Sequence, residues 1–376
     1  MQFTLEERPR KLDEVIGQKV IVESFKERLQ KDKINIPQAM ILEGLSGCGK
    51  TSLVNIIATT MQCEKPVVNK EGYIEPCLTC GNCQDIIKEN FSRDTHFIPA
   101  SMENGKEVIA NIEDLVSYYP SYSKYKIIIV GEIQNLTSSA KTALLELIEK
   151  PRKNVHFMFT TMDSSKIDKS VKDRCQVYKF KPVKTEEISD HLIGVIATKV
   201  QDDLPETFFS EVIPCISQNA NGSVRNALSL LEQCIVSKLY TEKELISNIG
   251  IITETTIESM LYKLLKKDES VLESLRDIEL EEFFRVSRYN LINALSYKIY
   301  CKDADDSNFM IKKFIAIGKQ ENLEELLEWY IKSDGVYFNK NTFIMNMCLY
   351  LKTKKNKLVE EVIRQPVERV VREVRT

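Results

Sequence analysis

Eight residues at positions 44–51 carry the clearest chemical pattern in the chain. They read GLSGCGKT and fit the spacing G-x-x-x-x-G-K-[S/T]. In a loop of this spacing the glycines let the backbone turn its N–H groups inward around phosphates, and the next helix adds partial positive charge at its N-terminus. Lys50 would reach the β- and γ-phosphates, and the hydroxyl of Thr51 would ligate Mg²⁺. The pattern predicts a nucleoside triphosphate site formed by Gly44, Gly47, Cys48, Gly49, Lys50, Thr51 and Ser52.

Short apolar runs and helical patterns alternate through the first half of the chain. Strand-like runs occupy residues 39–42 (AMIL), 126–130 (KIIIV), 155–160 (VHFMFT) and 177–180 (VYKF). Helical patterns lie between them, as at residues 52–61 and 138–149. Strands that alternate with helices indicate a mostly parallel sheet, and near-continuous apolar strands fit a sheet covered on both faces. The phosphate loop follows the first strand and precedes a helix, a context that opposes a chance match.

A second chemical pattern is a cluster of four of the ten cysteines, placed after the helix that follows the phosphate loop. Its members are Cys63, Cys77, Cys80 and Cys83, and two C-x-x-C steps share Cys80. Four thiolates suit a closed tetrahedral Zn²⁺ site that has no open position for catalysis. A disulfide is disfavoured because no secretory signal is present, and a redox C-x-x-C pair is disfavoured by the two further cysteines. The cluster therefore predicts a structural zinc site.

Length and composition limit the remaining classes. A chain of 376 residues, with 43% hydrophobic and 28% charged residues, fits two or three globular domains. Its formal charge of −3 excludes a histone-like polycation but leaves room for a local basic surface that faces nucleic acid. The sequence has neither a signal peptide nor a run of about 18 uncharged apolar residues. We therefore expect a cytoplasmic protein in a reducing compartment, with no membrane contact.

The N-terminal half resembles the AAA+ clamp-loader ATPases, namely the gamma/tau subunit of bacterial DNA polymerase III and the small subunits of replication factor C. The opening RPRKLDEVIGQ is similar to the signature R-P-x-x-x-x-x-[V/I]-[V/I]-G-Q of that family. The segments SSKI (164–167), DRC (173–175) and GSVRNAL (222–228) resemble later motifs in the same order. The gamma/tau subunit also carries a zinc module after the phosphate-loop helix. The likeness covers about residues 1–235.

The resemblance implies an α/β AAA+ P-loop core, a parallel sheet with helices on both faces, that carries a zinc-module insert and is followed by a helical lid and an all-α collar. We place the nucleotide-binding core at residues 1–180, with the zinc-binding insert at 61–90. The lid would occupy 181–245, and the collar or oligomerisation domain 246–376. The strand signal disappears after about Pro182. Because the chain ends about where the collar of the family ends, we expect no tau-like extension that tethers a polymerase. The insert would form an outer knob.

The family also suggests roles for residues around the nucleotide. Its opening stretch packs against adenine, which would place Arg8, Pro9, Val15, Ile16 and Gly17 beside the base. An amphipathic helix with its lead-in is the plainer interpretation of that stretch. Arg225, in GSVRNAL, would contact the γ-phosphate bound by this chain. Arg174, in DRC, would act in trans as an arginine finger at the site of a neighbouring subunit. A surface ion pair is the alternative for each arginine.

Two further surfaces follow from the resemblance. The segment PASMENG resembles the A-S-x-x-x-G turn of replication factor C, and in the family the next helix tracks the DNA backbone. Candidate phosphate contacts are therefore Asn104, Gly105 and Lys106. The hydrophobic residues that touch a clamp lie near positions 100–125 in the family. This chain has Tyr118, Tyr119 and Tyr122 there, although tyrosines in such a stretch are as often part of a core.

Two departures from the family fall on the residues that cleave ATP. The family ends its second core strand with D-E, in which the first acid holds Mg²⁺ through water and the second acts on the attacking water. Here the strand ends Gly131-Glu132, so the catalytic acid Glu132 is kept and the metal-side acid is missing. Aligned on SSKI, the polar sensor residue falls at Met162, which cannot orient water by a hydrogen bond. Thr161 is adjacent, but strand alternation would point it to the other face. We expect slow or absent hydrolysis at this site.

The sequence thus predicts an ATP-binding subunit of a sliding-clamp loader in DNA replication, a AAA+ ATPase type with ATP, Mg²⁺ and Zn²⁺ as cofactors. It would couple ATP binding and hydrolysis to clamp opening and loading on primer–template DNA. Its expected partners are the other subunits of a pentameric ring, the sliding clamp and primer–template DNA.

Three alternatives remain. The first is a non-hydrolysing, delta-prime-like stator of the same complex that supplies its arginine finger in trans. Gly131 and Met162 favour it, and the intact phosphate loop and Arg225 oppose it. The second is a AAA+ remodeller such as a branch-migration motor, against which the zinc insert, DRC and GSVRNAL argue. The third is a stand-alone ATP-regulated DNA-binding protein, which a mass measurement would separate from a pentamer.

Overall fold

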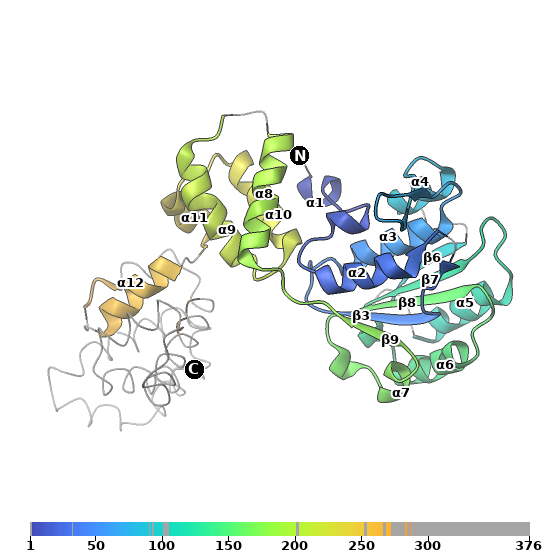
Figure 1. Cartoon of the computed structure of the whole chain (residues 1–376). Helices are drawn as coiled ribbons and strands as arrows, with labels where there is room; N and C mark the ends of the chain where they lie inside the picture. The colour runs from blue at the N-terminus through green and yellow to red at the C-terminus, as the bar shows by residue number, and fades with distance from the viewer. Residues whose placement is uncertain are drawn as a thin grey trace, which may run out of the picture. The chain divides into compact units, whose positions relative to one another are not determined.

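The chain forms two compact units, Met1–Tyr240 and Thr241–Thr376 (Figure 1). The computed structural model describes residues 2–265 except 32, 90, 92–93, 101–104, 201–202 and 252–253, and also residues 268–271, 283 and 287. No helix among these residues is both long and apolar enough to cross a membrane.

A five-stranded parallel sheet forms the centre of the first unit (Figure 1). In spatial order its strands are β6 (Thr95–Pro99), β7 (Lys126–Gly131), β8 (Val155–Thr161), β3 (Ala39–Glu43) and β9 (Gln176–Lys179). Every residue of β7 and β8 is buried, as expected for central strands covered on both faces. These strands include all four that the sequence predicts. The additional strand, β6, lies at the sheet edge, where its closing proline is tolerated.

Helices cover both faces of the sheet, which confirms the predicted core. Helices α2 (Lys19–Arg28) and α3 (Lys50–Gln62) share one apolar cluster with Met40, Leu42 and the odd-numbered isoleucines of β7. Helices α5 (Gly105–Ser117) and α6 (Ser138–Glu149) share the other cluster with Ile41 and Ile128. The alternation of side chains along each strand therefore divides the core into two layers.

Short elements complete the core. They are α1 (Phe3–Glu6), η1 (Leu12–Glu14), β1 (Leu29–Gln30), β2 (Lys33–Ile34), β4 (Val67–Val68), β5 (Ile74–Glu75), α4 (Gly81–Ile87), η2 (Ile133–Asn135), η3 (Ser164–Lys166) and α7 (Lys169–Lys172). Strands β4 and β5 form an antiparallel hairpin, and α4 packs against α3. Of the clustered cysteines, Cys63 directly follows α3, Cys77 follows the hairpin, and Cys80 and Cys83 lie at the start of α4.

After β9 the described part of the first unit is helical. Its elements are α8 (Thr185–Lys199), the π-helix η4 (Phe208–Val212), α9 (Ile213–Asn219) and α10 (Val224–Val236). The chain passes from sheet to helices beside Gly222, which has a φ of +77°. A Cβ on Gly222 would lie 2.4 Å from the Cβ of Pro182, so only glycine allows this close approach. The helices are thereby fixed to the end of the core.

The second unit contains α11 (Glu242–Ile249) and α12 (Glu254–Leu265) among its described residues. Thr241 and Glu244 form a capping box at the start of α11, and Gly250 ends that helix in a left-handed conformation. The predicted domain boundaries stay predictions. Most of the predicted collar, 246–376, lies outside the described residues.

Candidate functional site

A pocket with a volume of about 550 Å³ surrounds the phosphate loop, a size suited to a small ligand. It is enclosed by the N-terminal segment, the loop and the start of α3, the ends of β6 and β7, and the helices α8 and α10. The predicted site residues that line it are Arg8, Pro9, Val15, Ile16, Gly47, Cys48, Gly49, Lys50, Thr51, Ser52, Glu132 and Arg225. The structure also brings Phe97, His191 and Ser229 to this pocket, which no sequence motif indicated.

Two predicted contacts, Gly17 and Gly44, support the pocket without lining it. Gly17 has a φ of +75°, and a Cβ there would lie 2.8 Å from a methyl group of Val183. It therefore allows the N-terminal segment at positions 8–17, the base-side segment, to pack against the chain that leads into α8. Gly44 contributes its carbonyl oxygen to Lys50.

Lys50 is the buried cation at the centre of the phosphate loop. Only 6% of it is exposed, and its Nζ donates to the carbonyl oxygens of Gly44 and Leu45 at 2.7 Å each. Burial lowers the pKa of Lys50 because desolvation disfavours the ammonium form, while the negative charge of Glu132 acts in the opposite direction. A charged phosphate oxygen is a stronger partner for this ammonium group than a neutral carbonyl. The geometry therefore fits a bound polyphosphate.

The helix α10 closes directly on the loop. The backbone N–H of Val224 donates to the carbonyl oxygen of Gly47 at 3.1 Å. Ser223 caps the helix by accepting from the N–H of Asn226, and a Cβ on Gly47 would lie only 2.0 Å from the Ser223 hydroxyl. This close approach places Arg225, the residue after Val224, in the pocket.

Glu132 belongs to a hydrogen-bonded relay at the ends of β7 and β8. Its φ of 58° is the left-handed conformation, which is uncommon for a residue other than glycine. The amide of Gln134 donates to the Glu132 carboxylate, and the hydroxyl of Thr161 donates to Gln134 at 2.7 Å. Thr161 is fully buried, whereas Met162 is 49% exposed. Thr161 and Met162 thus differ in exposure as strand alternation predicts, and Gln134 links Thr161 to Glu132 from η2.

The four clustered cysteines have the geometry to hold a metal ion. Their sulfur atoms all lie within 4.8 Å of one another, and the Sγ atoms of Cys77 and Cys83 are 3.9 Å apart. Tetrahedral sulfurs at about 2.3 Å from zinc would be separated by about 3.8 Å. Hydrogen bonds from the backbone N–H and the hydroxyl of Thr79 lower the pKa of the Cys77 thiol to about 6. The thiolate form that binds metals is therefore favoured at Cys77, whereas burial raises the pKa of Cys63 and of Cys83.

Comparison with known proteins agrees with this arrangement. Residues 17–184 match the family model described as DNA polymerase III, delta subunit. The chain is 32% identical over 228 residues to DNA polymerase III subunit gamma of Buchnera aphidicola subsp. Schizaphis graminum, covering 61% of this chain and 59% of that protein. It is 29% identical over 275 residues to subunit tau of Bacillus subtilis, covering 72% and 46%. The chain is a relative of the gamma/tau clamp-loader subunits.

The aligned part thus spans about half of the length of these two gamma/tau proteins. Among solved structures, the RuvB branch-migration motor of Thermotoga maritima matches with a TM-score of 0.45 and 16% identity, over 88% of this chain and 91% of that one. A TM-score this low carries no argument about the fold of this chain. The gamma/tau relationship, the parallel sheet and the phosphate loop identify the first unit as a AAA+ core followed by helices.

The cysteine module of this gamma/tau relative is fastened to the base-side segment. Tyr73, in the hairpin, is 1% exposed, and its hydroxyl lies 2.8 Å from Asp13 and 3.2 Å from Glu75. Lys26 pairs with Asp13 at 2.7 Å and with Glu71 of the hairpin at 3.0 Å. The predicted outer knob is therefore also a support for the segment that lines the nucleotide pocket.

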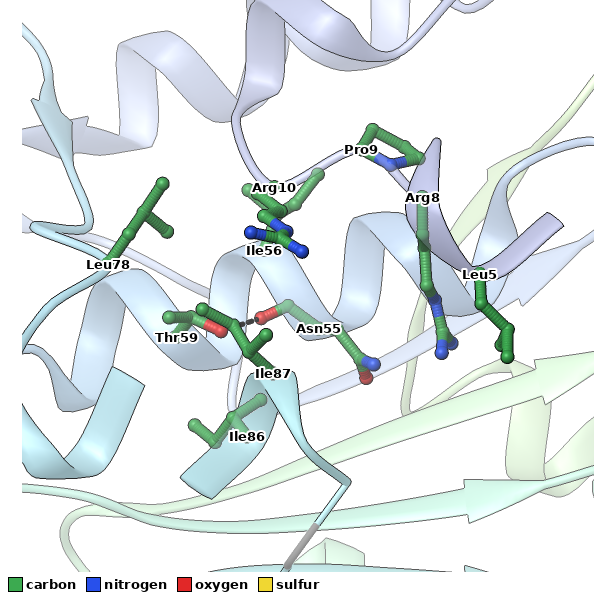
Figure 2. Close-up of a pocket in the computed structure, with 10 residues that line it drawn as sticks. All are labelled: Leu5, Arg8, Pro9, Arg10, Asn55, Ile56, Thr59, Leu78, Ile86 and Ile87. Atoms are coloured by element: carbon green, nitrogen blue, oxygen red, sulfur yellow. Dashed lines mark hydrogen bonds between the residues drawn. The ribbon is translucent and has the colours of Figure 1, made fainter. Parts of the chain in front are cut away.

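A smaller pocket of about 50 Å³ lies where that segment, α3 and the module meet (Figure 2). Arg8 and Pro9 line it from the segment, Asn55 and Thr59 from α3, and Ile86 from α4. Arg8 also lines the large pocket and pairs with Glu89 just beyond α4. One arginine thus contacts both the module side and the nucleotide side.

The remaining predicted residues lie away from the pocket. Arg174 is exposed, pairs with Glu149 at the end of α6, and donates to the carbonyl oxygen of Ser170 at 2.8 Å. Gly105 and Lys106 begin α5, as expected for candidate phosphate contacts, and Asn104 lies outside the described residues. The roles of these residues stay predictions.

The three tyrosines near position 120 are on the surface and are not core residues. Tyr118, Tyr119 and Tyr122 are 66%, 76% and 69% exposed. The loop is nevertheless fixed, because the buried carboxylate of Asp94 accepts the backbone N–H groups of three consecutive residues, 121–123, at 2.6–2.9 Å. We therefore regard this loop as a preformed candidate surface for a protein partner.

Tyr73→Phe tests whether the cysteine module is fastened through this hydroxyl. The substitution removes the hydroxyl shared by the exposed Asp13 and the buried Glu75, so we expect the free energy of unfolding to fall by about 1 kcal/mol. Tyr119→Phe is the matched control, with an expected change below about 0.5 kcal/mol. Urea denaturation followed by circular dichroism measures both. Equal, near-zero effects of the two substitutions would contradict the fastening.

Proposed function

We propose that this chain is an ATP-binding subunit of a sliding-clamp loader in DNA replication. The observation that carries the proposal is a single pocket in which Lys50, Glu132 and Arg225 face one another in a relative of the gamma/tau subunits. Mg²⁺ would join the nucleotide at Thr51. The proposed partners are the other subunits of a pentameric ring, a sliding clamp and primer–template DNA. ATP binding would order the ring so that it opens the clamp and grips the DNA.

We further propose that this subunit is a switch that binds ATP and cleaves it slowly. Gly131 provides no carboxylate beside Glu132, and Met162, at the sensor position, is 49% exposed to solvent. Electrostatic groups of this kind contribute several kcal/mol to a transition state, so their loss slows cleavage strongly. The same observations support the second candidate, a non-hydrolysing stator. On either proposal Arg174, exposed and away from the pocket of its own chain, would serve the site of a neighbour.

Arg174→Ala in the purified native assembly tests the proposed function. We expect the neighbouring site to lose about 10³-fold or more in hydrolysis rate, while the ATP affinity of this chain stays unchanged. Glu149→Gln is the matched control because it breaks the ion pair within the chain and keeps the arginine. Steady-state ATP turnover and nucleotide binding are the measurements. A collapse of affinity would place Arg174 in its own site, and an equal loss with Glu149→Gln would make the ion pair structural.

We propose that the four-cysteine cluster holds one structural Zn²⁺. The purified chain should then contain about one zinc per molecule by elemental analysis, and Cys77→Ser should lower this content by about 10-fold or more in dilute chelator. Cys175→Ser, outside the cluster, should retain the metal. Zinc-free native protein that keeps its melting temperature would refute a structural metal site.

We propose that the fixed tyrosine loop contacts the clamp. Replacing Tyr118 and Tyr119 together by alanine should weaken binding of the assembly to its clamp by about tenfold or more, since exposed aromatic side chains on a rigid loop dominate such interfaces. Val20→Ala, at a residue that is 85% exposed on α2, is the control. Unchanged affinity of the double variant in a titration with the clamp would exclude the loop from the interface.

A further inference from the structure

An aromatic ring stands where the missing metal-side carboxylate would project. Strands β6 and β7 pair in parallel, with Pro99 opposite Gly131 and Phe97 opposite Ile129. The ring of Phe97 leans along the strand, so that a Cβ built on Gly131 would lie 3.0 Å from its Cζ and 3.5 Å from its Cε2. Phe97 also lines the nucleotide pocket together with Lys50 and Thr51. The ring of Phe97 and the position without a carboxylate are therefore direct neighbours at the pocket wall.

The ring is held in this position by its neighbours. Phe97 stacks on Phe91 with ring centroids 5.6 Å apart and an interplanar angle of 28°. Both rings pack against the apolar cluster on the α3 side of the sheet. A side chain fixed on two sides does not make room for a new group without a cost in packing. The position of the ring is thus a property of the folded core.

No other carboxylate among the described lining residues takes the place of the missing one. Three glutamates line the pocket, and each already has a partner. Glu7 pairs with Lys199 at 3.4 Å, Glu89 pairs with Arg8, and Glu132 accepts from Gln134. A metal ion that keeps several waters needs acceptors for their protons, and a phenyl ring provides none. The β6 side of the pocket is therefore poorly suited to a hydrated Mg²⁺.

We propose that Phe97 determines the metal dependence of this nucleotide site: its ring excludes the hydrated metal from the β6 side, so that the pocket binds ATP with little gain from Mg²⁺. The inference rests on the proposed binding of ATP in this pocket and goes beyond it. It also implies that an acid at position 131 alone does not restore the metal site. The carboxylate would meet the ring, and the metal-bound waters would still face an apolar surface.

The test compares Gly131→Asp, Phe97→Ala and the double variant with the native chain. For each, ATP affinity is measured with and without added Mg²⁺, and the ratio is the readout. We expect a ratio near one for the native chain and for Gly131→Asp, and a ratio about 10–100-fold higher for the double variant, the size typical of a restored outer-shell partner. Phe209→Ala, which removes a partly exposed phenyl ring from η4, is the control for ring loss.

Gly131→Ala gives a second measurement that needs no charge and no metal. The added methyl group should lower the melting temperature relative to the native chain. This decrease should disappear when Phe97→Ala is also present, since the atoms nearest to the new methyl group belong to the Phe97 ring. The inference is overturned if Gly131→Asp alone raises the ratio as much as the double variant does, or if the double variant binds ATP without any gain. If no form binds ATP, the proposed function itself is wrong.

Discussion

The ends of three neighbouring parallel strands meet at one edge of the sheet, and the placement of the candidate site depends on this constraint. The phosphate loop leaves β3, Glu132 follows β7, and Thr161 ends β8. The register sets Glu43 beside Thr161, so that the residue before the loop and the end of the relay are fixed together. Ligands of open α/β sheets bind outside the carboxyl ends of the strands for this reason. A shift of one residue in any of these pairings would turn the side chains to the other face.

The sequence predicts the part of the site that is local. Within GLSGCGKT, residue types alone decide the backbone, and the loop has positive φ at its three glycines, as the motif requires. Two features that the sequence did not predict are contacts between segments that lie far apart in the chain. Thr161 joins the site only because Gln134 bridges to it, and Phe97 stands over Gly131 only because β6 pairs with β7. Since β6 reads THFIP, with polar residues at its start and a proline at its end, its pattern was too weak to be recognised as a strand.

The cysteine module also makes stabilising contacts that the spacing of its cysteines does not predict. Spacing predicts the four ligands, but it does not predict that Lys26 joins Asp13 of the base-side segment to Glu71 of the hairpin. The hydrogen bond with Asp13 and the other nearby carboxylates raise the pKa of Lys26, and the side chain of this lysine is only 12% exposed. Its partners Asp13 and Glu71 are 51% and 60% exposed, so solvent screens each pair and the link between segment and hairpin depends on the two pairs together. A metal that orders the hairpin would therefore also order one wall of the nucleotide pocket.

The groups proposed to bind ATP and the groups proposed to cleave it lie in different parts of this site. On this proposal, hydrolysis could weaken while ATP binding is kept. The groups proposed to bind the triphosphate lie on the loop, α3 and α10, and the contact of Val224 with Gly47 holds the loop and α10 together. The groups proposed to cleave it, and the ring that opposes them, lie on β6, β7 and β8. The contact between the loop and α10 does not involve Gly131 or Phe97, because the side chains nearest to Gly47 are those of Ser223 and Arg225. Nucleotide-driven assembly can therefore persist in a subunit with little turnover of its own, provided that another subunit completes the catalytic cycle.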